Sequence, residues 1–94
     1  MASEHHAEKV RITGRVQGVF FRAWARGEAE KLGLDGWVRN ERDGSVTALI
    51  AGPRADVDAM IALLRQGPPE AVVSDVAVEE ADPAEVPVGF SVRH

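Results

Sequence analysis

The chain has 94 residues, of which 45% are hydrophobic and 28% charged, and its formal net charge at pH 7 is −4. This length fits one domain with its own core, and the composition is that of a globular protein, not of a disordered one. The acidic balance argues against general nucleic-acid binding, which relies on a basic face. The absence of cysteine excludes disulfides, thiolate metal ligands and thiol catalysis.

The hydropathy pattern and the N-terminal residues indicate where in the cell the protein is found. No apolar run approaches the roughly 20 residues that a membrane helix needs, and the N-terminus lacks the basic and apolar regions of a signal peptide. We therefore expect a cytoplasmic protein that has no membrane partner. Residues 1–7 are expected to form a flexible segment and residues 8–94 a single domain. All three histidines lie near the chain ends, so we expect neither a metal site nor a cofactor.

The first half of the chain predicts a strand, a loop and a helix. Residues 8–13 alternate between apolar and polar side chains, which is typical of a half-buried strand. A glycine-containing loop follows. Apolar residues then recur at helical spacing from Phe21 to Leu32, and Gly33 is placed to end the helix in a left-handed conformation. Two β-rich runs, 36–40 and 45–50, surround an Asp-Gly turn and predict a hairpin.

The second half predicts another helix and two more strands. Gly52-Pro53 opens the helix, with proline expected at the first helical position, and Gly67-Pro68-Pro69 ends it. Strands are expected over residues 72–80 and 88–93, and residues 82–87 form the loosest connection. The order βαββαβ, with two helices on one face of a mixed or antiparallel sheet of four to five strands, predicts an α+β ferredoxin-like sandwich. This fold hosts many unrelated functions, so the site must decide.

The loop from Gly14 to Arg22 carries the clearest chemical signal. A loop between a strand and a helix can turn several backbone N–H groups toward one point, and the helix start adds its own unpaired amides. Arg22 supplies a forked set of donors suited to phosphate oxygens. The loop lacks the Gly-Lys-Ser/Thr of a Walker loop and the Gly-x-Gly-x-x-Gly of a dinucleotide fold. A plain strand-to-helix turn is the alternative interpretation of its glycines.

Cationic residues around the loop support anion binding. Arg11, Arg15, Arg22 and Arg26 gather there in sequence, whereas the acidic excess lies in the second half of the chain. A locally positive site on an acidic body suits a small anion better than a polyanion. The large aromatic residues are assigned to the core or to a pocket wall; they are Phe20, Phe21, Trp24, Trp37 and Phe90.

Two motifs together resemble those of the acylphosphatase family along nearly the whole chain. The first is the loop Gly-Arg-Val-Gln-Gly-Val-Phe-Phe-Arg at 14–22, and the second is Gly-Trp-Val-Arg-Asn at 36–40 followed by Asp43-Gly44. Gly67-Pro68-Pro69 and the closing run 90–93 resemble later landmarks of the family. Their order on the predicted fold makes the resemblance specific.

The resemblance implies a hydrolase that splits acyl phosphates into carboxylate and inorganic phosphate without metal or cofactor. It implies that Arg22 binds the phosphoryl group and that Asn40 positions the attacking water. Taken alone, Arg22 could be a surface arginine paired with Glu28 or Glu30, and Asn40 a turn residue. The phosphate-binding residues that it implies, mainly through main-chain amides, are Arg15, Val16, Gln17, Gly18, Val19, Phe20 and Arg22.

Two positions depart from the pattern of many relatives. Glu41 stands where threonine is common after the asparagine, and Ala51 stands where glutamine is common before the glycine that opens the second helix. Neither change removes the loop, the arginine or the asparagine, so we expect the chemistry to survive. Glu41 adds a negative charge near the expected anion site.

Other functions remain open at this stage. One is a binding module of the same fold, either for RNA, which would need exposed aromatics and a basic sheet face, or for a small anion, which would not need Asn40. Another is a domain of a larger maturation enzyme, which we disfavour because the chain starts and stops at the edges of the predicted fold. The expected partners are an acyl phosphate and inorganic phosphate, with no nucleic acid, and a monomer is the simplest state.

Overall fold

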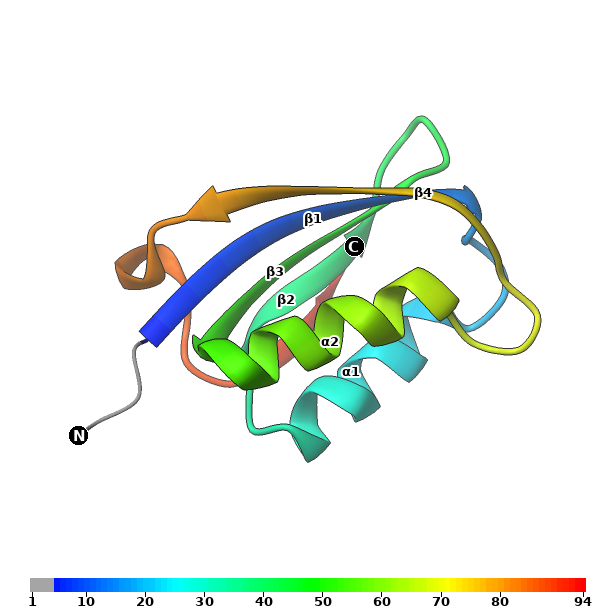
Figure 1. The fold of residues 1–94 in the computed structure, drawn as a ribbon. Helices are drawn as coiled ribbons and strands as arrows, with labels where there is room; N and C mark the ends of the chain where they lie inside the picture. Colours follow the sequence, from blue (N-terminus) through cyan, green and yellow to red (C-terminus); the bar gives the residue numbers. More distant parts are fainter. Residues whose placement is uncertain (1–4) are drawn as a thin grey trace.

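The computed structural model describes residues 5–94, which form a five-stranded sheet with two helices on one face (Figure 1). The sheet order is β4-β1-β3-β2-β5, with β5 parallel to β2 and every other neighbouring pair antiparallel. This confirms the ferredoxin-like α+β sandwich. The elements are β1 His5–Arg15, α1 Phe21–Lys31, β2 Asp35–Asn40, β3 Val46–Pro53, α2 Arg54–Gln66, β4 Val72–Ala81, the 3-10 helix η1 Pro83–Glu85 and β5 Phe90–Arg93.

The core lies between the helices and the inner face of the sheet. Alternate residues of β1 and β3 point into it, and one stripe of each helix covers them. Each large aliphatic side chain that is fully buried there contributes on the order of 1.5–3 kcal/mol. The largest fully buried side chains include Phe21, Ile12, Ile50, Met60 and Leu64.

Both central strands are longer than the sequence pattern predicts. β1 begins at His5 and not at residue 8, because His5, His6 and Ala7 pair with the last three residues of β3, which runs on to Pro53. Residues 5–7 are therefore part of the sheet, whereas residues 1–4 of the expected flexible segment lie outside the described residues. The domain boundary at residue 8 stays a prediction.

The ends of both helices follow local sequence signals. Gly33 has φ +70°, and hydrogen bonds from Gly33 N to Glu30 O (3.1 Å) and from Leu34 N to Ala29 O (3.0 Å) close α1, as expected. The expected position of Pro53 is wrong by one residue. Pro53 precedes the first helical residue with ψ 141° because it also ends β3. Helix α2 ends before Gly67 as predicted.

The connection between β4 and β5 is more ordered than expected. Residues 83–85 form η1, and the Asp82 carboxylate accepts a hydrogen bond from Ala84 N at 2.9 Å. Strand β5 begins at Phe90, two residues later than predicted. Within residues 5–94, no helix is both long and apolar enough to cross a membrane.

Candidate active site

The pairing of β1 with β4 becomes irregular just before the loop between β1 and α1. The register between these strands shifts between Thr13 and Gly14. Gly14 has φ +122°, and a Cβ at this position would lie 2.2 Å from the carbonyl oxygen of Val72. Only glycine fits this close approach, so the sequence itself sets the position of this β-bulge-like irregularity, two residues before the loop.

Residues 16–20, here called the β1–α1 loop, leave their amides unpaired. None of these five amides donates a hydrogen bond to another group within residues 5–94. Gly18 (φ +74°) and Phe20 (φ +68°) are left-handed, whereas Val19 between them is not. Such alternation turns successive N–H groups toward one side of the chain and makes an anion-binding concavity. Val16 and Val19 are 1% and 7% exposed and anchor the loop to the core.

Arg22 lies in the first turn of α1, as the sequence predicts. Its Nη1 donates a hydrogen bond to the carbonyl oxygen of Arg93 at 3.1 Å and lies 3.1 Å from Nδ1 of His94, so the end of β5 holds the guanidinium in place. The alternative partners Glu28 and Glu30 are taken. Nζ of Lys31 bonds the first at 3.5 Å, and Nε of Arg26 bonds the second at 3.2 Å. Arg22 therefore does not form an ion pair with either glutamate on the surface of α1.

Asn40 ends β2 on the inner side of the sheet. Val38, two residues earlier, is fully buried, and alternation along the strand places both side chains on the same face. The Oδ1 atom of Asn40 is buried and has no hydrogen-bond partner among the described residues. A buried acceptor without a partner costs about 1–3 kcal/mol. Water or a ligand that donates to Oδ1 would remove this cost.

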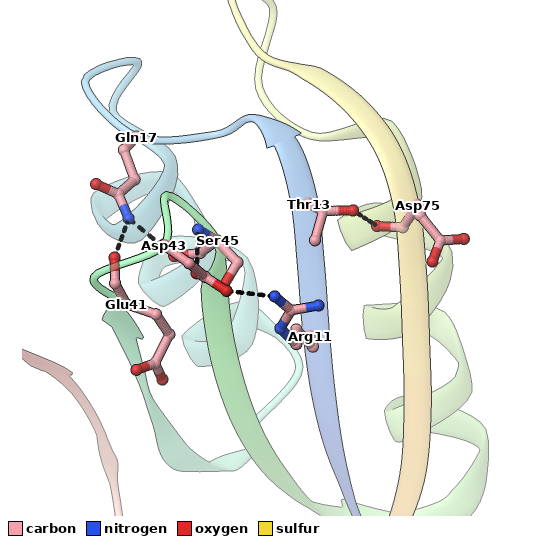
Figure 2. A network of polar contacts seen from close by, with 7 residues as sticks. All are labelled: Arg11, Thr13, Gln17, Glu41, Asp43, Ser45 and Asp75. Atoms are coloured by element: carbon pink, nitrogen blue, oxygen red, sulfur yellow. Dashed lines mark hydrogen bonds and ion pairs between the residues drawn. The ribbon is translucent and has the colours of Figure 1, made fainter.

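The side chain of Gln17 ties the β1–α1 loop to the β2–β3 hairpin turn. Its Nε2 donates to the carbonyl oxygens of Glu41 at 2.8 Å and Ser45 at 2.9 Å, on either side of that turn (Figure 2). Glu41 directly follows Asn40. These two hydrogen bonds therefore fix the distance between the loop amides and the Asn40 side chain.

One cleft of about 930 Å³ brings these groups together. It is lined by the whole β1–α1 loop, by Arg22, by Asn40 and by residues 68–70 between α2 and β4. Arg15, at the end of β1, is not among the lining residues. The expected gathering of four arginines is also absent from the cleft. Arg11 pairs with Asp43 on the opposite face of the sheet, and Arg26 pairs with Glu30.

The two unusual positions lie outside the cleft. The Glu41 carboxylate points away from the Gln17 side chain of the β1–α1 loop (Figure 2). It accepts a hydrogen bond from Nε of Arg39 at 2.9 Å. A hydrogen bond from Thr47, and then the one from Arg39, lowers the pKa of the Glu41 carboxyl below its usual value. Ala51 is fully buried in β3 and pairs with Ala7 and Asp35. The charge of Glu41 is thus balanced by arginine on the outer face.

The family model for acylphosphatase matches residues 8–92 of the chain. An acylphosphatase of Rhizobium meliloti (strain 1021) is 63% identical over 92 residues, which cover 98% of this chain and 97% of the relative. The chain belongs to the acylphosphatase family. The acylphosphatase crystal structure from Bacillus subtilis superposes with a TM-score of 0.90 at 35% identity, over 95% of this chain and 99% of that one.

A larger protein contains a similar unit. Full-length HypF, solved in a phosphate- and nucleotide-bound form, matches with a TM-score of 0.85 at 26% identity, over 100% of this chain and 12% of that one. The acylphosphatase unit thus also occurs as a small part of a longer chain. In the part of this acylphosphatase that the structure describes, no three His, Asp or Glu side chains lie close enough to hold a metal ion.

Sequence reasoning missed two features of the acylphosphatase cleft. The first is the side chain of Gln17, because only its main-chain amide was assigned a part. The second is the part of the cleft wall formed by Pro68, Pro69 and Glu70, which the pair of prolines in the sequence could have indicated.

Trp37 was expected in the core or a pocket wall. It lies on the outer sheet face, where Arg39 and Arg93 stack on its ring at 4.6 and 4.9 Å.

Proposed function

We propose that this acylphosphatase hydrolyses acyl phosphates to carboxylate and inorganic phosphate by direct attack of a water that Asn40 orients. One observation supports the roles that we assign to the loop amides, Arg22 and Asn40. Residues 16–20 with their unpaired amides, Arg22 with its guanidinium, and Asn40 with its unpartnered Oδ1 all line the same cleft. The first two groups suit a phosphoryl group, and the third suits a water.

The β1–α1 loop and Arg22 would stabilise the transferring phosphoryl group. Phosphoryl transfer spreads charge over three equatorial oxygens, and fixed N–H dipoles stabilise this charge without reorganising during the reaction. Arg22 keeps Nη2 and Nε in addition to the Nη1 that bonds Arg93, so two donors remain for phosphate oxygens. The loop amides and the guanidinium together would supply the binding and most of the rate enhancement.

Asn40 would act as an orienting group and not as a base. Its amide does not titrate near neutral pH, but Oδ1 can accept a hydrogen bond from a water and hold it in line with the scissile P–O bond. The leaving group is a carboxylate, whose conjugate acid has a pKa of about 4, so it departs without a proton. The reaction then needs neither a general acid nor a covalent intermediate.

The RNA-binding alternative receives little support from the outer sheet face. This face carries cations, but Trp37 is only 7% exposed and its ring is covered by two guanidinium groups. Bases need a free aromatic face for stacking. A small-anion sensor would use the loop and Arg22 but would not need the water-directed oxygen of Asn40.

The variant Asn40→Ala separates an enzyme from a sensor. We expect it to lower kcat for benzoyl phosphate by roughly 10²–10³, as removal of one preorganised polar group does. Inhibition by inorganic phosphate should stay nearly the same, because the loop and Arg22 are intact. Steady-state hydrolysis and competitive inhibition by phosphate measure the two effects. A loss of phosphate affinity equal to the loss of kcat would show that Asn40 binds the anion instead of the water.

We further propose a monomer in the cytoplasm that binds neither nucleic acid nor membranes. The support is the acidic net charge, the lack of cysteine and the scattering of the exposed large apolar residues, which do not form one patch around a single element. Sedimentation of the purified chain tests the oligomeric state.

A further inference from the structure

Phe20 is the most unusual apolar residue of the molecule. Its side chain is 84% exposed, and it is the one non-glycine residue within residues 5–94 that has a positive φ. Its neighbours Val19 and Phe21 are 7% and 2% exposed. The buried neighbours therefore anchor the backbone while the Phe20 ring stands at the mouth of the cleft. Strained, exposed residues of this kind cluster where a ligand binds.

The opposite wall of the cleft is also apolar. Pro68 and Pro69 lie in the connection between α2 and β4, which runs past the β1–α1 loop at one end of the molecule (Figure 1). A Cβ on Gly67 would lie 3.3 Å from Cε2 of Phe21, so this connection lies against the start of α1. Prolines present a rigid surface without N–H donors. Among residues 5–94, Glu70 is the single carboxylate that lines the cleft.

The order of the strands decides which end of the cleft receives the leaving group. Asn40 ends β2, whereas residues 68–70 lead into β4, and two strands lie between β2 and β4. With strands about 4.8 Å apart, β2 and β4 themselves are about 14 Å apart in the sheet. The attacking water and the leaving oxygen lie in line on opposite sides of phosphorus. A water at Asn40 therefore directs the acyl group toward Phe20 and the proline pair.

We propose that Phe20, Pro68 and Pro69 form an acyl subsite that takes apolar, uncharged acyl groups. The inference rests on the proposed function, because it assumes that the water binds at Asn40. The Phe20 ring covers one face of the acyl chain or ring, and the prolines cover the other. Glu70 at the rim repels acyl groups that carry a second carboxylate, so the subsite discriminates against dicarboxylic acyl phosphates.

Phe20→Asn tests the apolar wall. Asparagine adopts positive φ more readily than most residues, so the loop geometry is preserved while the ring is removed. We expect the ratio of kcat/KM for benzoyl phosphate to that for acetyl phosphate to fall about tenfold relative to the parent chain. The ratio cancels any general effect on the phosphate-binding amides. Val88→Asn is the matched control, because Val88 is 95% exposed and does not line the cleft, and it should leave both rates unchanged.

Glu70→Gln tests the rim with no change in the β1–α1 loop. We expect the ratio of kcat/KM for succinyl phosphate to that for acetyl phosphate to rise about threefold at low ionic strength, and the gain to shrink in salt. An unchanged ratio in both the Phe20 and the Glu70 variants, with an active parent chain, would overturn the subsite alone. A parent chain that hydrolyses none of the three acyl phosphates would overturn the proposed function itself.

Discussion

The β1–α1 loop and the β2–β3 turn are neighbouring connections of similar length, yet they treat their backbone groups in opposite ways. In the turn, Glu41 N donates to Ser45 O at 2.8 Å, Gly44 N to Glu41 O at 3.2 Å, and Ser45 N to the Asp43 carboxylate at 3.0 Å. In the loop, the five amides of residues 16–20 bond no other described group. Three of the five amides of residues 41–45 are thus bonded within the turn, whereas the loop bonds none of its own and leaves all five for a ligand.

The difference shows how a small fold can keep unsatisfied donors in a fixed geometry. Free amides cost stability, so the loop needs support from outside its own backbone. Buried Val16 and Val19 anchor it to the core, and Gln17 bonds it to the hairpin turn. An ion pair between Arg11 and Asp43 ties this hairpin turn to β1 (Figure 2). Rigidity of one connection thus preorganises the other.

Removal of the Arg22 guanidinium tests whether the loop amides alone are enough for catalysis. Arg22→Ala should lower kcat/KM for benzoyl phosphate by at least about 10³, the range found when an arginine that stabilises phosphoryl transfer is lost. Arg22→Lys should not restore the rate, because a point charge cannot reproduce the fork of donors. Steady-state kinetics measure both variants, and circular dichroism checks that the fold persists. Turnover by Arg22→Lys at the parent rate would contradict the role of the fork.

Cutting the connection between loop and turn should have the next largest effect. Gln17→Met keeps the length of the side chain but loses both donors. We expect kcat to fall about ten- to hundredfold, because a displacement of about 1 Å between phosphate and water costs a factor of this size. The inhibition constant of phosphate should rise by a smaller factor. Hydrolysis and phosphate inhibition, measured on the same preparation, give the two values.

Thr13→Val is the control for this variant. It removes another hydrogen bond from a side chain to a carbonyl near the loop, Thr13 Oγ1 to Asp75 O at 3.4 Å, without touching the hairpin turn. We expect kcat to stay near the parent value. Equal losses of kcat and of phosphate affinity in Gln17→Met would mean that the loop has collapsed and that Gln17 does not position it relative to Asn40.

A change within the turn alone should affect stability and leave catalysis largely intact. Hydrogen bonds from the side chain and the amide of Ser45, and then the contact with Arg11, lower the pKa of Asp43 well below its ordinary value of 3.8. A carboxyl group whose pKa is lowered by folding stabilises the native state above its ordinary pKa, and this contribution is lost as pH falls through the folded-state value.

We therefore expect Asp43→Asn to lower Tm modestly at neutral pH, and the difference from the parent chain to narrow as pH falls below 3.8. Thermal unfolding followed by circular dichroism from pH 7 to about pH 2 measures this narrowing. A difference in Tm that stays constant with pH would show that the charge of Asp43 does not support the turn.

Much of the fold follows from patterns that are local in sequence. Alternation of apolar and polar residues specifies β1, and an apolar stripe at helical spacing specifies α2. A glycine after the last turn of each helix marks where that helix ends. The residues at which strands begin and end were harder to predict from the sequence. Whether His5–Ala7 joins the sheet depends on how far β3 extends beside it, and that extension also moved Pro53 out of the helix. Pairing between distant segments decided both boundaries.

The sequence by itself determined where the β1–α1 loop lies, which we propose binds phosphate, because Gly14 and Gly18 permit backbone conformations that few other residues adopt. It also placed Arg22 in the first helical turn. Only the tertiary structure decided which groups share the cleft. It separated Arg11 and Arg26 from the loop, bonded Gln17 to the hairpin turn and brought residues 68–70 into the same cleft as Asn40. The reason is physical: backbone conformation is set by neighbours in the chain, whereas proximity across a sheet depends on strand order.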